Sequence, residues 1–317
     1  MIKDKSAKMF FLLYLVMIVT SFKSAKCESI FFVSDKDGCN AIYYMEDKVN
    51  VIKIFTLPKE FECKRIISLK LSPDGRYIAF SLDGGELFII ASNGTNHMAL
   101  GRGHSPSWSP SGSQIVFVDN GNIYIMDIRT LAIKKLADNG LSPDWSPDGK
   151  FIAFIRDKKN IILLKPDGSD QQTIFEAELT LVKQLARISW SPDSENLALI
   201  TDGRRRICVV RSDGKDLRFL YPDPDGQILV MTVGVDYPCW SNDGSKIMFM
   251  KTKSENQNDW DIWIMNHDGT EQQKVVCSSA YEGNPVFDNI RYNVQLIKSK
   301  KIEKWSMIKR KCLDHEL

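Results

Sequence analysis

One phrase recurs five times along the chain, at intervals typical of a repeat protein. It consists of an aromatic residue or leucine, then Ser-Pro-Asp-Gly or a close variant, a variable pair and an apolar run. Successive copies start 37, 37, 45 and 50 residues apart, at 71–75, 108–112, 145–149, 190–194 and 240–244. A period of about 40 residues built from strands and turns is the signature of a β-propeller, whose four-stranded blades stack around a central channel.

The third copy shows how one repeat makes one blade. Residues 143–145 form a short first strand, and Ser-Pro-Asp-Gly at 146–149 forms a tight turn. In that turn the proline presets one dihedral angle and the glycine allows a positive φ. The following sequence predicts second, third and fourth strands at 151–155, 161–164 and 172–175. Each copy therefore predicts one antiparallel blade.

Two incomplete parts of a blade remain, one toward each end of the chain. Residues 29–33, 40–45 and 49–54 match second, third and fourth strands that lack a first strand. Residues 283–287 match a first strand, with Phe287 where other copies carry Trp. We therefore expect an all-β, six-bladed β-propeller of four-stranded antiparallel blades, closed by N- and C-terminal strands that share one blade. Such a closure removes exposed sheet edges.

The recurrent tryptophans have two interpretations. They could form stacking platforms for carbohydrate, or they could fill the gaps between neighbouring blades. Regular recurrence at one position of the blade favours packing, because a large ring suits the wedge-shaped gap between two sheets. The residues concerned are Trp108, Trp145, Trp190 and Trp240.

These motifs resemble the TolB-type β-propeller repeat. The resemblance rests on Trp-Ser-Pro-Asp-Gly-x-x-Ile-Ala-Phe, and on Asp-Ile-Trp-Ile-Met-Asn at 261–266 followed by Asp-Gly-Thr at 268–270. It covers roughly residues 29–290 and implies a secreted propeller that binds protein, since the TolB propeller binds a peptidoglycan-associated lipoprotein. TolB carries an α/β domain before its propeller, and we expect the propeller here without that domain. The resemblance implies fold more strongly than function, because one fold hosts many functions.

The N-terminus has the layout of a secretory signal. Lysines up to Lys8 precede an apolar run over 9–19 and then small residues. A membrane-spanning helix needs about 20 apolar residues, so we expect no stable membrane span. We predict a signal peptide at 1–27, a propeller at 28–297 and a basic tail at 298–317. The protein would be exported to the periplasm or the extracellular space. In the alternative, a lipoprotein signal keeps Cys27 as a lipidated first residue.

The net charge argues against a nucleic-acid partner, and the cysteine spacing argues against a zinc site. A formal net charge of +2 gives no global attraction to nucleic acid, and we expect no nucleic-acid partner. The chain has 7 cysteines without a Cys-x-x-Cys pair, so zinc-binding spacing is absent. The sequence leaves disulfide pairing open.

The sequence shows no recognisable catalytic apparatus. It lacks the Gly-x-Ser-x-Gly elbow of α/β-hydrolases. Its 4 histidines are dispersed along the repeats and do not predict a metal cluster, so we expect neither catalytic residues nor a cofactor; they are His97, His104, His267 and His315. A propeller hydrolase or lyase acting on sugar or peptide is the alternative function.

Loop lengths single out one face of the predicted wheel. In an up-and-down blade, the second-to-third turns and the links between blades share a face, and the insertions at 176–184, 221–236 and 252–259 fall there. Long loops on a rigid scaffold commonly carry binding, although a solvated rim is the alternative. We expect a protein or cell-envelope partner to bind this face. The candidate residues are Arg204, Arg205, Arg206, Tyr221, Asp223, Asp225, Asp259 and Trp260.

Alternating carboxylates at Asp223 and Asp225 also match the start of a calcium loop. The terminal glutamate of such a loop is missing at the right spacing, so the sequence favours a plain turn at this point.

Overall fold

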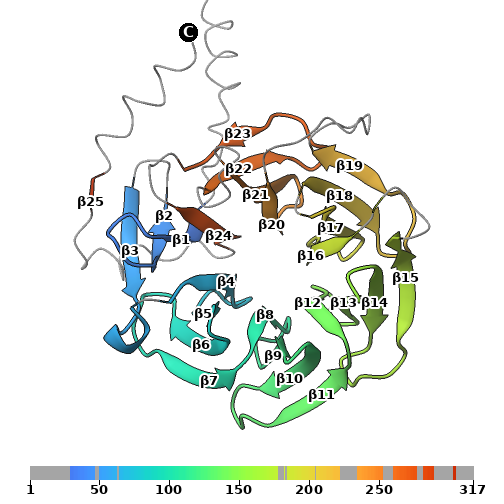
Figure 1. The fold of residues 1–317 in the computed structure, drawn as a ribbon, viewed down its shortest axis with the longest axis horizontal. Helices are drawn as coiled ribbons and strands as arrows, with labels where there is room; N and C mark the ends of the chain where they lie inside the picture. The colour runs from blue at the N-terminus through green and yellow to red at the C-terminus, as the bar shows by residue number, and fades with distance from the viewer. Residues whose placement is uncertain are drawn as a thin grey trace, which may run out of the picture.

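The molecule is a six-bladed wheel. A computed structural model describes residues 29–46, 50–62, 64–177, 182, 184–203, 205–221, 234–252, 260–276, 281–288 and 303–304. Six antiparallel sheets surround one axis, each with its innermost strand at the channel and its outermost strand at the rim (Figure 1). The expected six-bladed β-propeller is confirmed.

Each blade begins with the strand that precedes the Ser-Pro-Asp-Gly turn or its equivalent. Blade 1 contains β24 (Glu282–Phe287), β1 (Ile30–Ser34), β2 (Ala41–Met45) and β3 (Asn50–Thr56). Blade 2 contains β4 (Ile66–Leu71), β5 (Tyr77–Leu82), β6 (Glu86–Ala91) and β7 (Met98–Arg102). Blade 3 contains β8 (His104–Trp108), β9 (Gln114–Asp119), β10 (Asn122–Asp127) and β11 (Ile133–Ala137).

The second half of the wheel follows the same order. Blade 4 contains β12 (Gly140–Trp145), β13 (Ile152–Arg156), β14 (Asn160–Leu164) and β15 (Gln172–Glu176). Blade 5 contains β16 (Leu185–Trp190), β17 (Asn196–Thr201), β18 (Arg206–Arg211) and β19 (Arg218–Tyr221). Blade 6 contains β20 (Val235–Trp240), β21 (Lys246–Thr252), β22 (Trp260–Asn266) and β23 (Gln273–Lys274). The strands predicted from the third copy match blade 4 to within a few residues.

The ring closes within blade 1, as the two incomplete sequence pieces predicted. Strand β24 pairs antiparallel with β1, with Phe287 opposite Ile30 and Glu282 opposite Ser34. The hydroxyl of Tyr44 donates to the carboxylate of Asp288 at 3.1 Å and adds a side-chain tie across the same junction. The wheel is therefore held shut by a sheet made from both ends of the propeller sequence.

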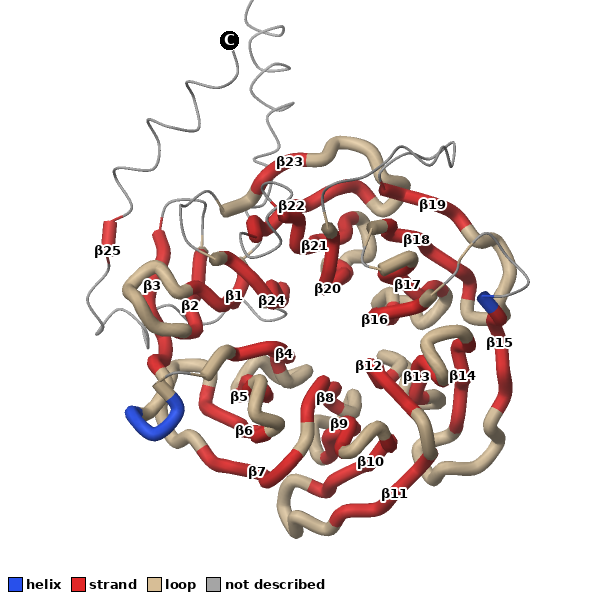
Figure 2. Tube along the Cα trace, in the orientation of Figure 1, coloured by secondary structure: helices blue, strands red, loops and turns tan. Residues whose placement is uncertain are grey.

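Two short elements lie outside the blade pattern. A 3-10 turn, η1 (Lys59–Phe61), connects blade 1 to blade 2 and is the larger of the blue segments in Figure 2, near the end of β3. Strand β25 (Glu303–Lys304) pairs with the outer edge of β3. The predicted signal segment at 1–27 lies outside the described residues, as does the predicted tail apart from β25.

Packing between blades supplies the hydrophobic core. Six clusters of buried side chains are present in the described structure, and each joins the facing surfaces of two neighbouring blades. The cluster between blades 6 and 1 combines Ile262 and Met248 with Phe32 and Tyr43. Alternate residues of a strand face opposite sides of its sheet, so each blade contributes to two clusters. The core is consequently a closed ring without a terminal layer.

The recurrent tryptophans stand in these interfaces and are 5–9% exposed, in agreement with the packing interpretation. Three of them also hydrogen-bond to the preceding blade. The indole nitrogens of Trp108, Trp190 and Trp240 donate to the carbonyls of Lys70, Asp144 and Ser189 at 3.1–3.2 Å. Each ring therefore fastens two blades together through burial and one directed bond.

The hydrogen bonding of the recurrent Ser-Pro-Asp-Gly turn is visible in blade 4. The hydroxyl of Ser146 donates to the carboxylate of Asp148 at 2.7 Å and accepts from the amide of Phe151 at 2.9 Å. Asp148 in turn accepts from the amide of Lys150 at 3.1 Å. Gly149 has a φ of 77°, a conformation that glycine adopts without steric cost. The serine and aspartate thus fix the entry into the next strand.

Blade 3 carries serine instead of aspartate in this turn, which provides a matched test. Replacing Ser146 with Ala should lower the free energy of unfolding by about 1–2 kcal/mol, because the Phe151 amide and Asp148 both lose a partner. Ser111→Asp should raise it by up to about 1 kcal/mol, because Ser109 and the Ser113 amide gain an ionised acceptor. Chemical denaturation measures both changes; a Ser146→Ala protein as stable as the parent would contradict this role of the serine.

The turn carboxylates should also make the fold sensitive to acid. The amide of Ser245 and the hydroxyls of Ser241 and Ser245 hydrogen-bond to Asp243 and hold its pKa below the ordinary value of 3.8. A depressed folded-state pKa contributes stability that is present above pH 3.8 and is lost as the pH falls through the folded-state pKa. The stability difference between the parent and Asp243→Asn should therefore shrink as the pH falls from about 5 to about 2. Unfolding curves across this range measure it, and a constant difference would contradict the assignment.

Candidate binding sites in the central channel

The innermost strands bring two sets of side chains to the channel. One set lies directly before the aromatic or leucine position of each strand, and we call it the turn-side ring: Lys70, Ser107, Asp144, Ser189, Cys239 and Val286. The other lies two residues earlier, and we call it the link-side ring: Ser68, Ser105, Ser142, Arg187, Tyr237 and Asn284. The first set lines one cavity at the axis, and five members of the second set line another.

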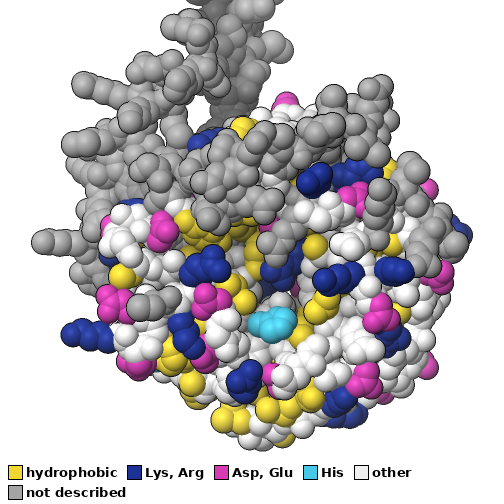
Figure 3. Space-filling view, viewed as in Figure 1, with side chains coloured by type: hydrophobic (Ala, Val, Ile, Leu, Met, Phe, Trp, Pro, Cys, Tyr) yellow, Lys and Arg dark blue, Asp and Glu magenta, His cyan; other side chains and the backbone are white. Residues whose placement is uncertain are grey.

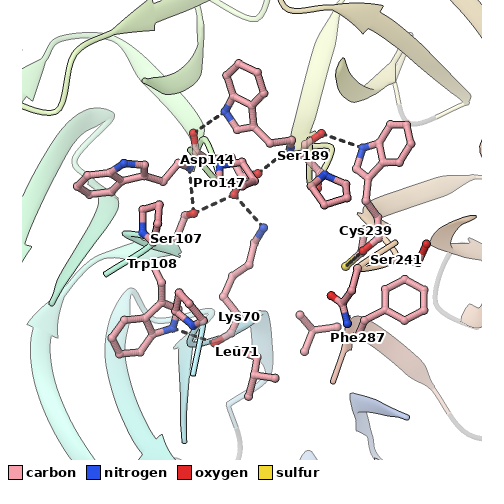
Figure 4. Close-up of a pocket in the computed structure, with 18 residues that line it drawn as sticks. Lys70, Leu71, Ser107, Trp108, Asp144, Pro147, Ser189, Cys239, Ser241 and Phe287 are labelled. Atoms are coloured by element: carbon pink, nitrogen blue, oxygen red, sulfur yellow. Dashed lines mark hydrogen bonds and ion pairs between the residues drawn. The ribbon is translucent and has the colours of Figure 1, made fainter. Parts of the chain in front are cut away.

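The turn-side ring surrounds a cavity of about 450 Å³ that opens among the Ser-Pro-Asp-Gly turns, on what we call the turn face (Figure 4). Four prolines and the tryptophan edges form its wall; the prolines are Pro73, Pro110, Pro147 and Pro192. Its ionisable lining comprises Lys70, Asp144 and Cys239.

Asp144 connects four blades at the base of this cavity. One carboxylate oxygen accepts from Lys70 Nζ at 2.9 Å and from the Ser107 hydroxyl at 2.8 Å, and the other accepts from the Trp190 amide at 2.9 Å. These partners lie on β4, β8 and β16, while Asp144 itself lies on β12. The residue is 6% exposed, so its charge is compensated by directed bonds and not by water. Figure 4 shows these bonds converging from both sides of the channel.

The ion pair with Asp144 also stabilises the charged form of Lys70. Burial opposes ionisation of its amine, but the nearby Asp144 carboxylate outweighs this effect and raises the pKa of Lys70 above its usual value. The side chain of Lys70 keeps 34% exposure, whereas that of Asp144 keeps 8%. The cavity therefore presents a charged amine whose counter-ion lies deeper in the wall.

The link-side ring depends on bulges in the innermost strands. In four of the described blades the ring residue has a left-handed φ near 50° and precedes a proline. Pairing with the second strand shifts register at these points, as a bulge requires. The four residues are Ser105, Ser142, Tyr237 and Asn284.

Arg187 crosses the channel within this ring. Its guanidinium donates to the Tyr237 hydroxyl at 2.6 Å and to the Ser105 hydroxyl at 3.3 Å, and it lies 3.4 Å from the Asp236 carboxylate. Tyr237 donates onward to the carbonyl of Ile67. Asp236 and Tyr237 keep the pKa of Arg187 above its usual value although burial opposes the charge. Blades 2, 3, 5 and 6 are thus tied together across the axis.

A second cavity, of about 340 Å³, opens at the opposite mouth of the channel. Its lining includes the second-to-third turns and blade links, so it belongs to what we call the link face. His104, Lys158 and Arg187 contribute its ionisable side chains. Burial, and then the positive charge of Arg187, lower the pKa of His104 below 6.5. Figure 3 shows a histidine and several basic side chains around the hollow at the ring centre.

The predicted partner-face residues divide into three groups. Arg205 is exposed in the turn between β17 and β18. Arg206 and Trp260 are each 8% exposed; Arg206 pairs with Asp202 at 3.4 Å and stacks over Phe219 at 4.5 Å. Tyr221 ends β19, and its side chain lies outside the described part of the structure. Arg204, Asp223, Asp225 and Asp259 also lie outside it.

The channel residues were missed in the sequence, although a signal for them was present. The aromatic or leucine residue of each repeat is a reference position, and the residues one and three places before it face the channel. Reading those columns across the copies would have singled out Lys70, Asp144 and Arg187 as charges inside an otherwise uncharged ring. Of the dispersed histidines, His104 begins β8 and His97 precedes β7.

The described residues lack the features of a metal cluster and of a membrane-spanning helix. They contain no group of three or more His, Cys, Asp or Glu side chains placed to hold a metal ion. No helix in the described part of the chain has the length and apolarity needed to cross a bilayer.

Burial raises the pKa of Cys208 to about 12, as expected for a thiol that serves as a small core residue.

Comparison with known proteins identifies the fold. No family model and no curated protein matches the sequence. Among solved structures, TolB from Acinetobacter baumannii is similar with a TM-score of 0.66 and 17% identity over 86% of this chain and 70% of that one. A putative TolB from Agrobacterium tumefaciens gives 0.58 and 18% identity over 81% and 91%. An oligogalacturonate lyase from Vibrio parahaemolyticus gives 0.52 and 14% over 79% and 76%. The resemblance to TolB-type propellers is confirmed at the level of fold.

The Asp144 network predicts a large and specific loss of stability. Asp144→Ala should lower the free energy of unfolding by about 3–5 kcal/mol, because it leaves the Lys70 amine and the Trp190 amide without their buried acceptor. Asp144→Asn should cost less, since an amide oxygen still accepts. In the Asn background, Lys70→Met should recover stability by removing the uncompensated charge. Urea denaturation of the set tests the network, and equal losses for Ala and Asn would contradict it.

Proposed function

We propose that the chain is an exported, non-catalytic propeller scaffold that binds a protein or cell-envelope component through its link face. The observation that carries the proposal is the cavity at the channel mouth on this face. Gly203, from the turn between β17 and β18, is part of its lining. The cavity and the exposed Arg205 therefore lie beside each other on one surface, as a binding site on a rigid scaffold requires.

Anchoring of that turn supports its use as a recognition element. The amide of Arg205 donates to the carbonyl of Thr201 at 3.1 Å, so the turn closes on itself. Arg206 is fixed in the blade by Asp202 and Phe219. A turn held at both ends loses little conformational entropy when a partner binds its exposed arginine.

Export is part of the proposal and rests on the basic and apolar pattern at residues 1–27. The fold similarity to TolB supports a scaffold that presents one face to a partner. A hydrolase or lyase acting on sugar or peptide is the second candidate, because the oligogalacturonate lyase shares the propeller fold. A screen for turnover of sugar and peptide substrates, combined with a metal-content assay of the purified protein, separates the two candidates.

If the partner binds the link face, replacing an exposed arginine should weaken partner capture on that face but not on the turn face. Arg205→Ser should reduce capture of the partner from native envelope or culture fluid by about threefold or more, since an interface cation contributes about 1 kcal/mol or more. Arg206 is not replaced in this experiment, because its side chain is buried in the blade. Arg76→Ser, on the turn face and with 73% of its side chain exposed, is the matched control and should leave capture unchanged. Equal capture by parent and Arg205→Ser would remove this turn from the interface.

A further inference from the structure

The link-face cavity lies between blades 4 and 5 where their innermost strands reach the mouth of the channel. Strand β12 contributes Leu141 and Ser142, and β16 contributes Ala186 and Arg187. Lys158, from the turn between β13 and β14, stands at its outer edge and is exposed. A volume of about 340 Å³ accommodates one extended side chain together with part of its backbone.

The cavity is positively charged by composition. Its described lining contains Lys158 and Arg187 but no aspartate or glutamate. His104 lies at the same mouth and is influenced by the same cation. After burial, the charge of Arg187 is the larger influence on its pKa, and it outweighs the opposing charge of Asp119. A ligand entering this mouth therefore meets a potential that favours anions.

Arg187 is fixed in place before any ligand arrives. Tyr237 and Ser105 accept its hydrogen bonds, Asp236 balances its charge from the far side, and the Tyr237 ring lies 4.3 Å from the guanidinium carbon. Its side chain nevertheless keeps 19% exposure. A cation that is already oriented loses little entropy on binding, which favours recognition of a carboxylate at a defined position.

We propose that this cavity receives a glutamate or aspartate side chain from an acidic segment of the partner protein. The carboxylate lies between Lys158 and Arg187, and its methylene groups pack against Leu141 and Ala186, which are both partly exposed. The inference rests on the proposed function, because it assigns ligand chemistry to the same link face. A peptide fits better than a free sugar acid, since the partly exposed apolar wall matches methylene groups.

Binding of a defined probe tests the proposal. An N-acetylated, C-amidated tetraglutamate peptide should bind the full-length protein saturably in calorimetric titration at low salt, and a tetraglutamine peptide should not. Lys158→Gln should weaken tetraglutamate binding about three- to tenfold. Lys150→Gln is the matched control, because Lys150 belongs to the same blade but lies on the turn face with 72% of its side chain exposed. It should leave the affinity unchanged.

Three outcomes would overturn the proposal: absence of saturable tetraglutamate binding, equal weakening by Lys158→Gln and Lys150→Gln, or binding of galacturonate in place of the peptide. Partner capture by the Arg205→Ser and Lys158→Gln variants distinguishes failure of this proposal from failure of the proposed function. If Arg205→Ser reduces capture while Lys158→Gln does not, the link face remains the binding surface and the cavity is not its acidic subsite. If neither variant changes capture, both proposals fail together.

Discussion

The arrangement of the blades in the closed ring depends on how the charged side chains at its axis are paired. Six innermost strands converge there, and most of the residues they present are small or uncharged. The exceptions on the turn side are Lys70 and Asp144, and the Asp144 carboxylate accepts bonds from three other blades. Arg187 has the complementary role on the link side, where it joins blade 5 to blades 3 and 6. An unpaired charge at either position would be costly, so the two networks favour one arrangement of the blades.

These networks complement the hydrophobic ring but do not replace it. The interfaces between blades bury large apolar side chains, and burial supplies most of the folding free energy. Apolar packing alone tolerates small sliding of one sheet on another. The indole bonds of Trp108, Trp190 and Trp240, together with the bonds to Asp144, join defined atoms of neighbouring blades. Directed bonds thereby fix the register that burial leaves adjustable.

Most of the architecture could be predicted from the sequence because its signal is repeated. Five copies of one turn, each followed by apolar strands, fix the blade, and the incomplete pieces before residue 57 and after 281 fix the closure. The burial of Arg206 and Trp260 could not be predicted in the same way. Both stand at strand ends, where a shift of one residue moves a side chain from solvent to the blade interface. The left-handed residues before the channel prolines were also hidden, since a bulge depends on pairing with the neighbouring strand.

The two mouths of the channel differ in a way that bears on function. At the turn face, the cation of Lys70 has its counter-ion Asp144 in the same cavity wall, so the field there is largely cancelled. At the link face, Asp236 balances Arg187 from β20, outside the described lining of the cavity, and Lys158 adds a second cation at the rim. Lys158 has no acidic partner in that lining, so it adds positive charge at the opening while the buried ion pair stays intact. The fold can therefore be stabilised by its axial charges and still present one of them to a ligand.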